Sequence, residues 1–276
     1  MTAIRTNSGP LRLGAVAYDP KVVTIWEGFL PYFATHGAPI DYVLYSNYDA
    51  QVEANLAGEI DVAWNSPLAW LKSQHDSHGG CRAIAMRDSD RDLTTKILVR
   101  KTSNVASLAD LRGKTIAVGA SDSPQATLIP LLLLAEAGVV PGEDCRVLYH
   151  NVMVGKHGDH VGGERDAARD LAAGRADGAC VLDVNYAVFV NEGTLDPGTT
   201  RVLASTAPFD HCNFTVNADL PPERWHPFVD VLLGMSFEDP EVRTLMELEG
   251  LKRWLPARTS GYAQLQRAVE RFKFYA

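Results

Sequence analysis

Apolar and polar residues follow a regular pattern along most of this chain. Short runs that are mostly apolar, such as residues 40–45, are typical of buried strands. Between these runs, apolar residues return every three or four positions. In residues 22–34, for example, Ile25 and Phe29 fall on one face, which predicts an amphipathic helix. Strands that alternate with helices favour parallel sheets covered by helices on both faces, so the pattern predicts an α/β fold with mostly parallel sheets.

The same pattern gives the bounds of the other elements. Further strands are expected at residues 11–17, 60–64, 82–86, 95–100, 115–118, 146–150, 200–203 and 213–216. Further helices are expected at residues 49–57, 124–137, 222–233, 240–247 and 261–274. The glycine-rich residues 151–163 are expected to form a loop.

One unit of this pattern occurs twice. Leu-Ala-Gly-x-x-Asp-x-Ala at residues 56–63 matches Ala-Ala-Gly-x-x-Asp-x-Ala at residues 172–179. Each copy predicts a helix that stops at a glycine in the left-handed conformation, then a brief strand, then a polar turn. Ligands of open α/β sheets bind beyond the carboxyl ends of strands. Two copies far apart in the sequence therefore predict two similar lobes that face one another across a cleft.

The position of the second copy defines the expected domains. Residues 11–101 and 206–276 are expected to form lobe 1, and residues 102–205 an inserted lobe 2. Two chain crossings, near residues 100–103 and 204–208, would then form a two-strand hinge. Residues 1–10 are expected to be an N-terminal tail.

Composition and charge exclude several classes of protein. The chain has 46% hydrophobic and 22% charged residues and a formal net charge of −8, which is typical of a globular protein and argues against nucleic acid as a partner. No apolar run approaches the roughly 18 residues that a membrane span needs, so no membrane insertion is expected. The four cysteines lack CxxC spacing and are expected to be buried free thiols. A small-molecule partner is the remaining expectation.

The N-terminal residues bear on localisation. They contain no apolar core of the kind found in secretory signals, so the sequence as written predicts a cytoplasmic protein. Removal of a signal from a longer precursor would instead make the protein periplasmic or extracellular. The sequence leaves open whether the chain is a monomer or a dimer.

Three collinear segments resemble one family. They are Gly58-x-x-Asp-Val-Ala-x-x-x-Pro-Leu-Ala, Ser107-Leu-Ala-Asp-Leu-Arg-Gly-Lys-Thr-Ile-Ala-Val-Gly and Leu128-Ile-Pro-x-x-Leu-Leu-x-x-Ala-Gly. These segments resemble the phosphate/phosphonate-type solute-binding proteins of ABC importers. The resemblance implies a type II periplasmic-binding-protein fold whose two lobes close on an anionic small molecule such as a phosphonate, phosphate or carboxylate. It implies no cofactor, and an ABC permease as partner if the chain is exported.

The resemblance and the positions of polar residues at strand ends together give the candidate ligand-binding residues. These are Tyr18, Trp64, Asn65, Ser66, Ser123, Gln125, His157 and Asp183. Structural roles remain open for several of them. Trp64 also fits the core of lobe 1, and His157 also fits a solvent-exposed loop. Ser123 and Asp183 also fit helix N-caps.

Asp122 departs from the pattern of the family and leaves a second function open. Phosphonate binders place small hydroxyl residues in this loop, and a carboxylate there would repel a dianion unless it is turned away or protonated. The alternative function is a cytoplasmic lyase or hydrolase that resembles chorismate dehydratases or aryl sulfinate hydrolases. His157 or His160 would then act as general acid or base, oriented by Asp122 or Asp183. Cys180, inside a predicted strand, is interpreted as core.

Two His-x-x-His pairs raise the possibility of a metal site. They are His157 with His160 and His75 with His78. Zinc needs three or four converging ligands at fixed geometry, which neither pair supplies by itself. We therefore expect no metal.

Overall fold

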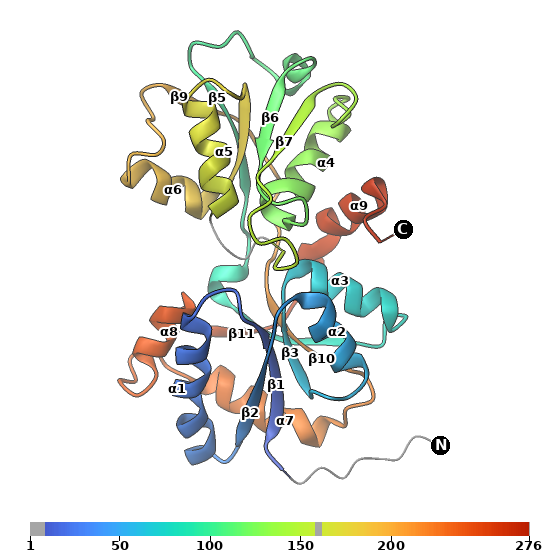
Figure 1. Cartoon of the computed structure of the whole chain (residues 1–276). Coiled ribbons are helices and arrows are strands. Elements are labelled where there is room, and N and C mark those ends of the chain that lie inside the picture. The colour runs from blue at the N-terminus through green and yellow to red at the C-terminus, as the bar shows by residue number, and fades with distance from the viewer. Residues whose placement is uncertain (1–8, 158–161, 276) are drawn as a thin grey trace. The chain divides into compact units, whose positions relative to one another are not determined.

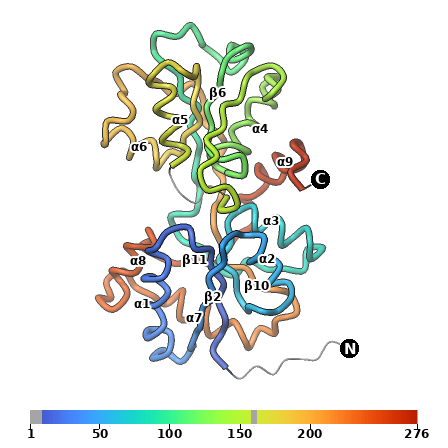
Figure 2. Tube along the Cα trace, in the orientation of Figure 1, coloured from blue at the N-terminus to red at the C-terminus, as the bar shows by residue number. Residues whose placement is uncertain are grey.

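The computed structural model describes residues 9–157 and 162–275 (Figure 1). The chain divides into two compact units. The first contains the residues up to Asn65, Lys72–Ser89 and Cys212–Arg258. The second contains Ser66–Leu71, Asp90–His211 and the residues from Thr259 onward. In Figure 2 the first unit accordingly combines blue and orange segments from opposite ends of the sequence. The expected lobe boundaries, after residues 101 and 205, stay a prediction.

The first unit is built on a six-stranded sheet in the order β11-β4-β10-β3-β1-β2. Its strands are β1 (Leu11–Val16), β2 (Ile40–Tyr45), β3 (Val62–Asn65), β4 (Arg82–Arg87), β10 (Asn213–Val216) and β11 (Trp254–Pro256). Its helices are α1 (Lys21–Thr35), α2 (Tyr48–Leu56), α7 (Pro222–Gly234) and α8 (Arg243–Glu249). Helix α3 (Pro67–Asp76) contains residues of both units.

Alternation along β1 places helices on both faces of this sheet. Leu11 and Leu13 join the core cluster that includes Phe29 of α1 and Phe228 of α7. Gly14 faces the other way, where an added Cβ would meet Gln51 of α2. Successive side chains of a strand point to opposite faces, so α1 and α7 cover one face and α2 the other.

The second unit is built on a five-stranded sheet in the order β7-β6-β8-β5-β9. Its strands are β5 (Thr95–Arg100), β6 (Thr115–Val118), β7 (Arg146–Tyr149), β8 (Gly178–Leu182) and β9 (Thr200–Ser205). Its α-helices are α4 (Ile129–Glu136), α5 (Gly162–Ala172), α6 (Asp183–Asn191) and α9 (Ala263–Phe272). A five-residue π-helix, η3 (Pro124–Leu128), leads directly into α4, and shorter 3₁₀ turns are η1 (Asp88–Asp90), η2 (Leu108–Leu111) and η4 (Ser260–Tyr262).

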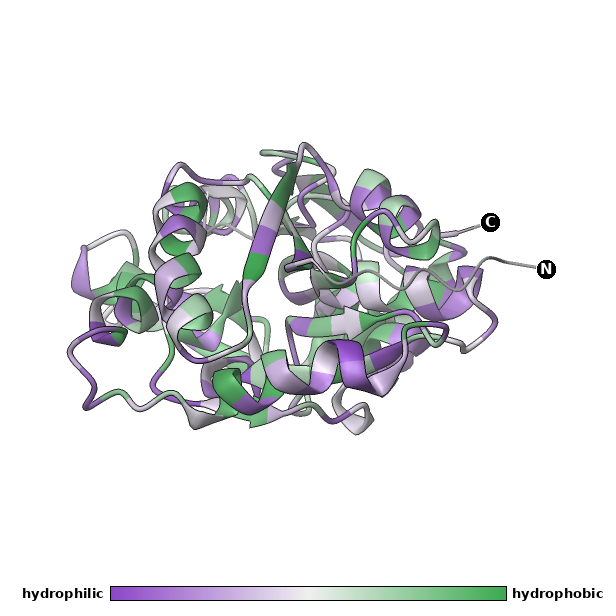
Figure 3. Ribbon diagram, turned by 90° about the horizontal axis from the view of Figure 1, so that it is seen from below, coloured by the Kyte–Doolittle hydropathy of each residue, from purple (hydrophilic) through white to green (hydrophobic). Residues whose placement is uncertain are grey.

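Two core clusters cover the two faces of the second sheet. Leu131 of α4 packs in a cluster with Ile97 of β5, whereas Leu171 of α5 packs in another with Leu98. Ile97 and Leu98, which are neighbours in β5, thus pack against helices on opposite faces of the sheet, which confirms that helices cover both faces. Helix α5 is amphipathic, whereas α4 is apolar on nearly every side and most of its residues are buried. In Figure 3, hydrophobic and hydrophilic residues alternate along several helices.

The two-lobed α/β fold is confirmed, and each sheet is mixed rather than purely parallel. Strands β2 and β3 run parallel to β1, and β7 and β8 run parallel to β6. In contrast, β10 is antiparallel to both of its neighbours, and so is β5. Only strands joined by a crossover within one sheet must run parallel. Strands β5 and β10 enter their sheets from the other unit, so this constraint does not apply to them.

Some element bounds also differ from the expectation. Helix α8 lies at Arg243–Glu249 rather than at 240–247, and β11 was not expected. The helix expected at 124–137 begins with the π-helical turn, in which the Leu128 N–H donates to the Ser123 carbonyl (3.0 Å). All four cysteines are free and buried, as expected. Among the described residues, no helix combines the length and the apolar character that a membrane crossing requires.

The repeated motif has the same structural role in both units. Gly58 and Gly174 both have left-handed backbone, with φ of 72° and 76°. Three residues later, the Asp61 carboxylate accepts the Arg12 N–H (2.8 Å), and the Asp177 carboxylate accepts the Thr115 N–H (3.0 Å). Each aspartate thus ties its segment to the start of a neighbouring strand. The Gly-x-x-Asp motif therefore specifies a turn and a strand anchor.

Candidate functional site

The loop after β6 ends in a capped helix within the second unit. The Ser123 hydroxyl accepts the Ala126 N–H (3.2 Å), and Pro124 occupies the first helical position. The helix begun here continues through α4 to Glu136. Its first N–H groups and its dipole give this end a positive potential, which favours anions. The N-cap role expected for Ser123 is confirmed.

Ser66 and His157 meet although 91 positions separate them in the sequence. The Ser66 Oγ lies 2.6 Å from the His157 Nδ1, and both side chains are buried. The same Oγ accepts the Ala69 N–H (3.2 Å) at the start of α3. Since this oxygen already accepts one hydrogen bond, its own proton is suited to donate to Nδ1. The ring then carries its proton on Nε2.

Burial fixes the charge of His157. Loss of water contact lowers its pKa from 6.5 to about 3, so the imidazole is neutral near pH 7. Its backbone is left-handed, with φ of 51°, which is uncommon for a residue other than glycine. Of the alternatives left open for this residue, placement in a solvent-exposed loop is therefore wrong.

Asp122 ties two loops together. Its Oδ2 accepts the Gly155 N–H (2.6 Å), and the neighbouring Ser121 N–H donates to the Asn151 Oδ1 (2.8 Å). The loop that carries Ser123 is thus attached to the loop that carries His157. Together these contacts join Ser66, Asp122, Ser123 and His157 into one group of polar residues, which we call the Ser123–His157 cluster.

Gln125 connects this cluster to a buried acid. Its amide lies against the carboxylate of Glu164, which is fully buried in α5. The Glu164 Oε2 accepts hydrogen bonds from the Leu182 N–H (2.9 Å) and the Asn185 amide (3.0 Å). Burial raises the pKa of Glu164, and the hydrogen bonds from Asn185 and Leu182 counteract that rise.

His211 extends this set of contacts on the other side of Gln125. Its Nε2 lies 3.3 Å from the Gln125 Oε1, and its Nδ1 lies 3.5 Å from the Asp90 carboxylate. The sequence reasoning missed both Glu164 and His211. Glu164 had a usable signal, because it shares a helix face with Ala168 and Leu171, where a solvent-exposed acid is not expected.

Three candidates belong to the first unit, where Trp64 and Asn65 have internal roles. Trp64 packs on Phe214 in the core, with ring centroids 4.6 Å apart, so its alternative core role is confirmed. Asn65 is fully buried; its Oδ1 accepts the Gln51 amide (2.9 Å) and its Nδ2 donates to Ser73 (3.3 Å). Tyr18 is partly buried at the end of β1. Ligand contact by these residues stays a prediction.

The remaining candidates lie at β8 or outside the described residues. Asp183 is the first residue of α6, so Leu182 rather than Asp183 occupies the N-cap. The Asp183 carboxylate accepts a hydrogen bond from the Thr94 hydroxyl (3.1 Å). Cys180 lies in the core of β8, as interpreted, and burial raises the pKa of its thiol. His160 lies outside the described residues.

The fold defines the class of this protein. Solved structures with the type II periplasmic-binding-protein fold align along nearly the whole chain. PhnD1 from Prochlorococcus marinus in complex with methylphosphonate shares 17% identity and a TM-score of 0.68, over 95% of this chain and 98% of that one. XAC2383 from Xanthomonas citri, bound to chloride ion, shares 20% identity and a TM-score of 0.72, over 96% and 99%. At this level of identity the likeness shows the fold.

The sequence defines the family. Residues 15–262 match the family described as ABC transporter, phosphonate, periplasmic substrate-binding protein, and the chain belongs to that family. The phosphate-import protein PhnD of Mycolicibacterium smegmatis is 23% identical over 258 residues, which cover 87% of this chain and 71% of that protein. The resemblance inferred from the three sequence segments is thereby confirmed. Members of this family are the solute-binding components of ABC transporters, whose partners are a small ligand and a permease.

Proposed function

We propose that this protein binds a small phosphorus oxyanion, a phosphonate or phosphate, at the Ser123–His157 cluster and delivers it to an ABC permease. One observation carries the proposal: the segments expected to bind ligand, which lie far apart in the sequence, are joined by the Ser66–His157 and Asp122–Gly155 hydrogen bonds. Family membership supports this ligand class, and so does the similarity to a phosphate-import protein and to a methylphosphonate-bound structure.

The chemistry of the cluster suits an oxyanion. The helix that starts at Ser123 offers its N-terminal N–H groups, and the neutral His157 ring offers its Nε2–H. The residues are nearly inaccessible to solvent, and hydrogen bonds made in such surroundings are stronger than in water. The two nearby acids, Asp122 and Glu164, favour a ligand that carries a proton of its own, because a ligand hydroxyl can donate to a carboxylate.

The same geometry gives little support to the enzyme alternative. A general acid or base works best with a pKa near the operating pH, and the His157 pKa of about 3 lies far below it. Asp122 hydrogen-bonds to the Gly155 backbone, which gives its carboxylate a role in positioning the loop. Cys180 is inside the sheet core. Binding without chemical conversion is therefore the function that the site favours.

Isothermal titration tests the proposal on protein that has been unfolded in urea, dialysed and refolded to remove any retained ligand. The titrants are methylphosphonate, phosphate and methanesulfonate, which has a similar shape but no ionisable hydroxyl. We expect both phosphorus compounds to bind more tightly than methanesulfonate. A folded protein that releases no heat with either phosphorus compound would refute the ligand class.

Variants test the location of the site. Ser66→Ala is expected to weaken methylphosphonate binding at least about tenfold, because it removes the hydroxyl that sets the His157 proton. Ser103→Ala is the matched control: its hydroxyl donates to the Arg100 carbonyl (2.8 Å) in the same unit, away from the cluster, and binding should not change. If Ser66→Ala and Ser103→Ala bind methylphosphonate with equal affinity, the Ser123–His157 cluster is not the binding site. Consumption of methylphosphonate, followed by ³¹P NMR, would instead establish the enzyme alternative.

A further inference from the structure

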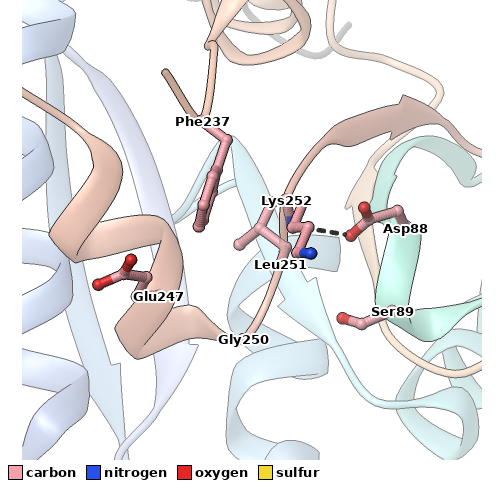
Figure 4. Close-up of a pocket in the computed structure, with 7 residues that line it drawn as sticks. All are labelled: Asp88, Ser89, Phe237, Glu247, Gly250, Leu251 and Lys252. Carbon is pink, nitrogen blue, oxygen red and sulfur yellow. Dashed lines mark hydrogen bonds between the residues drawn. The ribbon is translucent and has the colours of Figure 1, made fainter. Parts of the chain in front are cut away.

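A pocket lies within the first unit, whereas the Ser123–His157 cluster belongs to the second. It has a volume of about 460 Å³, within the range of small-molecule sites. Its lining consists of Asp88, Ser89, Phe237, Glu247, Gly250, Leu251 and Lys252. Figure 4 shows Phe237 and Leu251 between the Glu247 carboxylate on one side and Asp88 with Ser89 on the other.

Backbone hydrogen bonds fix the positions of several residues that line this pocket. The Lys252 N–H donates to the Asp88 carboxylate (3.1 Å), and the Asp88 N–H donates to the Arg253 carbonyl (3.0 Å). Gly250 ends α8 in the left-handed conformation, with φ of 77°. The chain then turns into Leu251, which is buried in the core. The pocket is thus a fixed feature of the first unit.

An internal group shows which chemistry the pocket accepts. The Arg243 guanidinium lies 5.0 Å from the centre of the Phe237 ring, and its Nε lies 3.2 Å from the Glu247 carboxylate. A planar cation therefore already contacts Phe237 and Glu247, two of the residues that line the pocket, although Arg243 itself is not part of the lining. Both partners of the ion pair are about half exposed, with 53% and 52% of their side chains accessible, so the pair is weak and can be exchanged for another cation.

We propose that this pocket binds a small planar organic cation, an aromatic amidinium or guanidinium compound. The ligand ring would lie on Phe237 above Leu251 and its charge would face Glu247 and Asp88, in place of the Arg243 guanidinium. Lys252 is exposed and can turn toward solvent. The chain's formal net charge of −8 also favours the approach of cations. This site is independent of the proposed oxyanion site.

Benzamidinium is the probe, and neutral benzamide is its isosteric control. Titration followed by ¹⁵N–¹H NMR should show saturable shifts at residues 237 and 247–252 with benzamidinium and not with benzamide. Equal binding of the two compounds would overturn the proposal, because charge would then play no part. Absence of saturable shifts with benzamidinium would overturn it as well.

Two variants should weaken benzamidinium binding and a third should tighten it. Phe237→Leu should weaken benzamidinium binding about threefold and Glu247→Gln about fivefold, since each removes one attraction for the cation. Arg243→Gln should tighten binding about threefold, because the internal competitor is lost. Glu241→Gln, an exposed acid outside the lining, is the matched control and should change nothing. An Arg243→Gln variant that binds no better than the natural chain would refute the competition. Methylphosphonate titration of the same variants should be unaffected, which separates this proposal from the oxyanion site.

Discussion

Replacement of Ser66 by alanine should destabilise the protein through two separate losses. The Ser66 hydroxyl caps α3 through the Ala69 N–H, and loss of such a cap costs about 1 kcal/mol. The substitution also leaves the His157 Nδ1 buried without the hydroxyl that lies 2.6 Å away, which costs about 1–3 kcal/mol. We therefore expect the free energy of unfolding to fall by about 3 kcal/mol, or roughly 8 °C in Tm.

A double-mutant cycle separates the two losses. Ser66→Ala, His157→Ala and the double variant are unfolded with urea and followed by circular dichroism. Alanine at 157 keeps the left-handed strain of that position, so the backbone term cancels. The coupling energy should be about 1–2 kcal/mol, because only the hydroxyl–imidazole contact is shared. Two single effects that add to within about 0.3 kcal/mol would refute the contact as a source of stability.

Three further predictions follow from burial and close packing. Burial lowers the pKa of His157 to about 3, so between pH 6.5 and 3 the unfolded chain binds a proton that the folded chain does not. The free energy of unfolding should therefore decrease as the pH is lowered across that window, by about 1.4 kcal/mol per pH unit. Urea titrations of His157→Ala should not show this slope. Burial raises the pKa of Glu164 above its ordinary value of 4.5, so the stabilisation that its neutral form allows is lost as the pH rises through the raised pKa. Glu164→Gln, which carries no charge, should therefore gain stability relative to the natural chain as the pH is raised above 4.5. A stability difference that does not vary with pH would contradict this. Gly261→Ala would place a Cβ on top of the Asp210 side chain and should lower the free energy of unfolding by at least about 2 kcal/mol, measured by calorimetry. Gly234→Ala is the control: its Cβ meets nothing within 4 Å, so stability should stay the same or increase.

Periodicity predicted most of the fold because it reports on local structure and on burial. Ile25 and Phe29 do face the core of the first unit, as their spacing indicated. The direction of a strand depends on how the chain enters its sheet, and this information is not local. For that reason the sequence pattern did not indicate which strands are antiparallel, among them β5 and β10, which follow the crossings between the units.

The repeated motif correctly predicted two similar structural units, but the sequence did not explain the aspartate within each copy. Gly58 and Gly174 were expected to adopt left-handed backbone and do so. Asp61 and Asp177 follow at the same offset, and only the structure shows that each accepts a backbone N–H at the start of a neighbouring strand. The motif is therefore evidence for the architecture, and ligand chemistry has to be sought elsewhere.

The candidate site shows why contact partners are harder to predict than positions. The rule that ligands gather at strand ends selected Ser66 and Ser123, the family resemblance indicated the region of His157, and hydrogen bonds connect these segments. The role of Asp122 could not be deduced, because its partner is a backbone N–H of a loop 33 positions away. Judged from the sequence alone, the negative charge of Asp122 would oppose anion binding. Hydrogen-bonded to Gly155, its carboxylate positions the loop that carries His157, and a ligand with a proton of its own can approach without the full repulsion of a dianion. If the proposed oxyanion binds at this cluster, the departure from the family pattern favours its protonated form.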